Sequence, residues 1–270
     1  MSGTEIGRSI CETVSPEEVL QQGDFVLWPG ATAFLEQAGI IVTADCDLAF
    51  GKHWGRISVV PVFALSTYVE ELLAPRVLSK QLTKLREAFG RQIQRVLAPS
   101  DESIPSDAAI DPLLSASTLP QPLAGETSLV NLHSVLRQAL GYERSVPNLE
   151  CLARAIALVN AGSGNTLRSH IKNGLSSLPG DVLAVPRIDG LPFTAGVAWL
   201  RVIREVPEAS IARKMSDMAP GRCIRIGRLI PVLRYRLTQM LGQVFSDIGL
   251  PENYELLKRE LIDSYTAGVA

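Results

Sequence analysis

The feature that most constrains the fold is a change in hydrophobic spacing along the chain. Three short β-branched segments, "FVLWPG", "AGIIVTAD" and "RISVVPVFAL", are separated by turn residues and predict three strands joined by short loops. After Pro75, apolar residues recur every three or four positions as far as Val96, which predicts a surface helix with a basic side. Strand character returns in 181–206. This alternation predicts an α+β chain, with a small β-barrel or bent sheet packed against a larger helical part.

Four regions follow from this spacing. The segment 98–127 contains five prolines and no lysine or arginine, so we expect a long loop or a partly disordered insertion there. A helical cap and turn are expected at Ser15, because Ser15 and Glu18 have the spacing of a capping box. The predicted regions are a barrel-like part (15–75), a helical part with the loop insertion (76–178), returning strands (179–206) and a C-terminal helical part with a basic patch (207–270). A last helix is expected over 252–264.

Composition narrows the classes of protein that fit. A chain of 270 residues, 46% hydrophobic and with a net charge of -2, can build a sizeable core and has no global attraction to nucleic acid or anionic lipid. The first thirty residues lack a signal-peptide pattern, and no apolar stretch is long enough to span a membrane, so we expect a cytoplasmic protein without membrane contact. The four cysteines are widely spaced, which predicts neither a disulfide framework nor a structural zinc site.

The order "GDFV", "GIIVTADCD", "ISVVPV" resembles the small SH3-like barrel of the PemK/MazF toxin family over residues 22–66. That resemblance implies RNA cleavage by an arginine before the second strand and a Thr or Ser after the proline of the third. Gln37-Ala38-Gly39 and Val62-Phe63 stand at those places instead. Without a cation for the transition-state charge, the barrel is expected to bind or to scaffold.

A second resemblance involves more of the chain. The D-C-D motif and the C-terminal "GRLIPVLRYRLTQMLGQVFSDIGLP" are similar to uncharacterised bacterial proteins of conflict and phage-defence loci. That group implies no catalytic residues.

The stretch "GIIVTADCDLAFGKHW" offers candidate chemistry. On an extended strand exit, Asp45 and Asp47 would share one face and Cys46 would point inward. The two carboxylates either pair with arginines from elsewhere in the chain or hold Mg²⁺ or Mn²⁺. A catalytic role for Asp45, Asp47 and His53, or for Cys46 with His53 as its base, is a further alternative.

An arginine-rich segment near the C-terminus is the candidate site for nucleic acid or phosphate. Arginine forks bind phosphate bidentately, and a helix starting near Pro231 would add backbone donors. Internal pairing with Asp24, Asp45 or Asp47 is the alternative. The residues concerned are Arg222, Arg225, Arg228, Arg234, Arg236 and Gln239.

These observations favour a non-enzymatic binding or adaptor component, of a bacterial conflict or anti-phage defence system, that needs no cofactor. It would engage a protein partner from a neighbouring gene, or nucleic acid. The alternatives are a metal-dependent nuclease or hydrolase using Asp45 and Asp47, and a structural subunit of a multiprotein complex.

Overall fold

Short strands form one highly curved sheet in the computed structural model, which describes residues 10–100, 103, 105–159, 166–186 and 188–246. The strand order is β1-β9-β2-β3-β4-β6-β5, with β7 beside β4 and β8 beside β9. Every pairing is antiparallel except that of β8 with β9. The strands are β1 (Cys11–Glu12), β2 (Asp24–Leu27), β3 (Ala38–Ile41), β4 (Arg56–Ala64), β5 (Val182–Pro186), β6 (Ala195–Trp199), β7 (Arg204–Pro207), β8 (Ile211–Ala212) and β9 (Cys223–Leu229).

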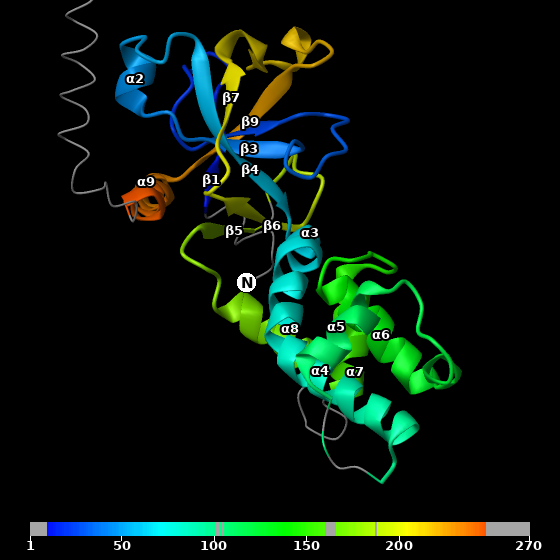
Figure 1. Cartoon of the computed structure of the whole chain (residues 1–270). Coiled ribbons are helices and arrows are strands. Elements are labelled where there is room, and N and C mark those ends of the chain that lie inside the picture. Colours follow the sequence, from blue (N-terminus) through cyan, green and yellow to red (C-terminus); the bar gives the residue numbers. More distant parts are fainter. Residues whose placement is uncertain (1–9, 101–102, 104, 160–165, 187, 247–270) are drawn as a thin grey trace, which may run out of the picture.

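The sheet curls into a half-barrel, and one short connection links two strands that pair with β4 and β9, on either side of β2 and β3. β7 lies beside β4, and β8 lies beside β9. Only the three-residue 3₁₀ turn Glu208–Ser210 separates β7 from β8 in the chain. The concave core contains Val26, Ile41, Ile57 and Val206, all buried. The open end of this half-barrel, with α2 (Asp45–Ala49) at its rim, lies at the top of Figure 1.

The helical part is an excursion from the sheet between β4 and β5. It begins as one continuous helix formed by α3 (Leu65–Tyr68), a π-helical turn (Val69–Leu73) and α4 (Ala74–Leu97). The π turn directly precedes Pro75, whose missing N–H cannot close an ordinary helical hydrogen bond. The remaining helices are α5 (Asp107–Ser115), α6 (Thr127–Ala139), α7 (Asn148–Val159) and α8 (Leu167–Ser176), with a 3₁₀ turn at Leu123–Gly125.

Two further cores hold the sheet and the helices. α4, α5, α6 and α7 bury Leu85, Phe89, Leu114 and Leu136 away from the sheet, at the lower right of Figure 1. α9 (Pro231–Ser246) instead packs Leu237 and Met240 onto the outer face of the sheet. The α+β class and the bent sheet are therefore confirmed. Within the described residues, no helix is both long and apolar enough to cross a bilayer.

Three local expectations are wrong. The segment 98–127 contains α5 and a 3₁₀ turn, because Ile110 and Leu114 bury themselves in the helical core. The segment 207–246 is not only helical: β8 and β9 lie within it. The D-C-D motif starts helix α2 and does not continue the strand.

The expected cap and turn at Ser15 are confirmed. The Ser15 N–H donates to the Glu18 carboxylate, the Glu17 N–H donates to the Ser15 hydroxyl, and a single turn forms there. The helix expected over 252–264 lies outside the described residues.

Candidate binding site at the open end of the half-barrel

Two of the five arginines are buried supports of the fold. Arg225 and Arg228 lie on β9, and their side chains are 2% and 5% exposed. Arg228 Nε donates to Asp24 Oδ1 at 2.5 Å, and Arg225 NH1 lies 3.5 Å from Asp24 Oδ2. Burial raises the pKa of the Asp24 carboxyl group, and hydrogen bonds from Arg228 and the Gln21 backbone oppose that shift.

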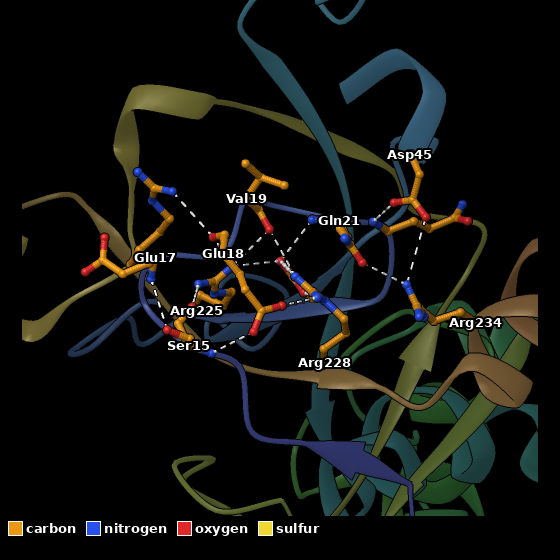
Figure 2. Close-up of polar contacts among 12 residues, drawn as sticks. Ser15, Glu17, Glu18, Val19, Gln21, Asp45, Arg225, Arg228 and Arg234 are labelled. Carbon is orange, nitrogen blue, oxygen red and sulfur yellow. Dashed lines mark hydrogen bonds and ion pairs between the residues drawn. The ribbon is translucent and has the colours of Figure 1, made fainter. Parts of the chain in front are cut away.

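The same two arginines hold the loop that precedes β2. Arg225 donates to the carbonyl oxygens of Ser15, Glu18 and Val19 at 2.7–3.2 Å. Arg228 donates to the Val19 carbonyl and to the Glu18 carboxylate, each at 3.0 Å (Figure 2). Because backbone carbonyls in a loop have no sheet partner, the two guanidinium groups replace a strand in satisfying them. They therefore shape the rim of the half-barrel, and they are not available to a phosphate.

The remaining members of the arginine group are scattered over the molecule. Arg234 NH1 donates to Gln21 Oε1 at 3.0 Å and lies 3.9 Å from Asp45 Oδ2. Arg236 donates to Gln239 on the exposed side of α9. Arg222 donates to two backbone carbonyls near η3 (Glu208–Ser210). The predicted patch is therefore not one set of free guanidinium groups, because each of these arginines binds a different protein acceptor.

The two aspartates of the D-C-D motif do not converge on a metal. Asp45 Oδ1 accepts the Gln22 N–H at 2.7 Å, while Asp47 Oδ1 lies 3.7 Å from the Cys46 thiol. Cys46 is exposed, contrary to the expected inward orientation, because the motif is helical. In the described part of the chain, no three His, Cys, Asp or Glu side chains gather as metal ligands.

His53 is locked between two acceptors. Its Nδ1 donates to the Asp47 carbonyl at 3.1 Å, and its Nε2 donates to Glu208 Oε2 at 2.8 Å. A neutral imidazole has only one N–H, so both bonds require the protonated ring. The hydrogen bond to Glu208 and the bond to the Asp47 carbonyl raise the pKa of His53. Both ring nitrogens of His53 are thus engaged by protein acceptors, which does not suit the ring to be a base for Cys46 or a metal ligand.

His53 ties down a loop that displays two aromatic side chains. The loop 50–55 follows α2, and it exposes 76% of Phe50 and 89% of Trp54. Trp54 has φ 53°, a conformation that costs a non-glycine residue on the order of 1–2 kcal/mol. The backbone N–H of Trp54 donates to the Gly51 carbonyl, and the backbone N–H of Glu208 donates to the Gly55 carbonyl at 2.8 Å. The fold thus holds Trp54 in solvent in a strained geometry.

This aromatic loop escaped the sequence analysis. "FGKHWG" was treated as the end of a possible metal site, although a Trp between two glycines in a turn is itself a signal of an exposed aromatic residue. Strand β9 was also missed, despite the apolar residues of "CIRIGRL" between Gly221 and Pro231.

Comparisons with protein-family models, curated proteins and solved structures give no match. The fold and this site therefore stand on their own geometry.

Proposed function

We propose that the chain is a non-enzymatic adaptor that binds a partner protein through the open end of its half-barrel. The observation that carries this proposal is Trp54, 89% exposed on a turn that the His53–Glu208 contact holds in place. Large aromatic residues of this kind dominate binding energy at protein interfaces. A preorganised loop also avoids the entropy cost of ordering on association.

The half-barrel connection supports the remaining part of the proposal. A 3₁₀ turn that links β7 to β8 is compatible with the small SH3-like barrel that residues 22–66 resemble. The D-C-D motif and the C-terminal segment resemble proteins of bacterial conflict and defence loci, so we place the partner in such a locus. Products of the adjacent genes are the first partners to test.

Site-specific photo-crosslinking in cells tests this function. A benzophenone amino acid is placed at position 54, and in a control chain at Tyr142, which is 53% exposed on the helical part. We expect a defined adduct with another protein from position 54 that is missing from position 142. The partner should also fail to co-purify with the Trp54→Ala variant, while circular dichroism shows an unchanged fold. Equal adducts from both positions, or co-purification that is insensitive to Trp54→Ala, would contradict the proposal.

A further inference from the structure

A cleft of about 600 Å³ opens beside the Trp54 loop at the end of the half-barrel. Gly55, the residue after Trp54, lines one side of it, and the loop held by Arg225 and Arg228 lines the other. The mouth of a small barrel is a common place for a ligand. Its wall contains Val19, Leu20, Glu208, Ile211, Arg213 and Arg222, among others.

Two guanidinium groups in this wall have no carboxylate partner in the described structure. Arg222 is held by the carbonyls of Asp217 and Ala209 at 2.6 and 2.7 Å, and its Nε is buried without a partner. Arg213 is exposed, and its hydrogen bond to the Glu18 carbonyl is long, at 3.4 Å. The partly buried guanidinium of Arg222 is stabilised when a carboxylate approaches it, and the exposed Arg213 can add a second charge-assisted hydrogen bond.

The acidic residues of the wall do not cancel both charges. Glu208 is already paired with His53 at 2.8 Å, and outside the cleft wall Glu17 is paired with Lys214 at 2.9 Å. Asp217 remains, and its Oδ1 accepts from the Ser216 hydroxyl. Arg213 and Arg222 against Asp217 leave the cleft with an excess of positive charge. Beside this charge lies the apolar side chain of Val19, 66% exposed.

We infer that this cleft binds a peptide segment of the partner protein in which an Asp or Glu lies beside a bulky apolar residue. The inference rests on the proposed function and adds the chemistry of the partner. The carboxylate is bound by Arg213 and Arg222, and the apolar side chain lies between Val19 and the Trp54 loop. A nucleic acid fits less well, because Asp217 lies in the same wall and would repel the neighbouring phosphates of a continuous chain.

Selection of random linear peptides displayed on phage, with the full chain immobilised, tests this chemistry. We expect enriched sequences to contain an acid within two residues of an aromatic or aliphatic residue. A synthetic peptide of the enriched sequence should lose about tenfold or more in affinity, about 1.4 kcal/mol, against Arg213→Glu. Arg91→Glu on α4 is the matched control, since Arg91 is also exposed and belongs to the distant helical part. A peptide with Lys in place of its acid should regain affinity for Arg213→Glu.

The outcomes separate this inference from the proposed function. Trp54-dependent peptides without an acid, or binding that is insensitive to Arg213→Glu, would overturn the inference and leave the adaptor function intact. A chain that enriches no Trp54-dependent peptide and gives no adduct from position 54 would contradict both. Tight, salt-sensitive binding of oligothymidylate that Arg213→Glu abolishes would assign the cleft to nucleic acid and also overturn the inference.

Discussion

Replacing Arg228 by Met should destabilise the half-barrel more than any substitution on its surface. Arg228 is 5% exposed and its partner Asp24 is 0% exposed, so the substitution leaves a buried carboxylate with Arg225 as its remaining guanidinium partner, 3.5 Å away. It also removes donors from the Val19 carbonyl and from the Glu18 carboxylate. The loop that lines the cleft then loses the two hydrogen bonds that Arg228 donates to it.

The magnitude follows from this geometry. Removing one partner of a buried pair costs about 3–5 kcal/mol, a large part of the 5–15 kcal/mol that holds a typical domain together. Arg56 and Glu205 form an ion pair on the same half-barrel, but their side chains are 56% and 58% exposed. Arg56→Met should therefore cost less than about 1 kcal/mol.

Urea unfolding followed by tryptophan fluorescence measures the difference. The three tryptophans, Trp28, Trp54 and Trp199, all belong to the sheet part of the chain, so the signal reports chiefly on the half-barrel and, through Trp199, on its contact with α3 and α8. We expect the free energy of unfolding to fall by about 3–5 kcal/mol for Arg228→Met. Adding Asp24→Asn should recover part of the loss, because the uncompensated charge is then gone.

An Arg228→Met variant within about 1 kcal/mol of wild type would refute the claim that this arginine supports the fold. If the variant were that stable, Arg228 would again be a candidate for binding phosphate.

Three further predictions concern other parts of the chain. Hydrogen bonds, chiefly to Glu208, raise the pKa of His53 above about 6.5, so this contact stabilises the protein fully below that pH, and the stabilisation is lost as the pH rises through the raised pKa. The urea midpoint of wild type relative to His53→Gln should fall over that window, and a constant difference would contradict the assignment. Leu114→Ala should cost about 2–5 kcal/mol by circular dichroism if α5 belongs to the core, whereas Leu97→Ala, at an exposed site, should cost far less. Native protein should show one fast thiol toward Ellman's reagent, and Cys46→Ser should remove it, because the other three thiols are more buried and have pKa values raised to about 11.

Local patterns predicted several of the strands that build the sheet, although not β9. "AGIIVTAD" and "RISVVPVFAL" do form β3 and β4, and the helical spacing after Pro75 forms α4. These patterns succeed because strand and helix periods depend on residues close together in sequence. The same reasoning failed at 98–127, where the prolines suggested a loop but Ile110 and Leu114 found a core to fill.

The candidate site was predicted less well because its contacts are long-range. Arg225 and Arg228 follow Asp24 by about 200 positions, and the pairing of β2 with β9 alone brings them together. No spacing in the sequence distinguishes an arginine that binds a buried aspartate from one that binds a phosphate.

The sequence by itself determined the α+β class, the positions of most elements and the presence of an arginine-rich segment, because these depend on composition and local period. Only the tertiary structure decided that two of the arginines are buried, that His53 is held by Glu208, and that Trp54 stands exposed beside a cleft. The physical reason is that charge pairing and burial depend on which distant strands meet. Those contacts place two arginines of the predicted phosphate site inside the fold, where they bind Asp24 and the loop before β2.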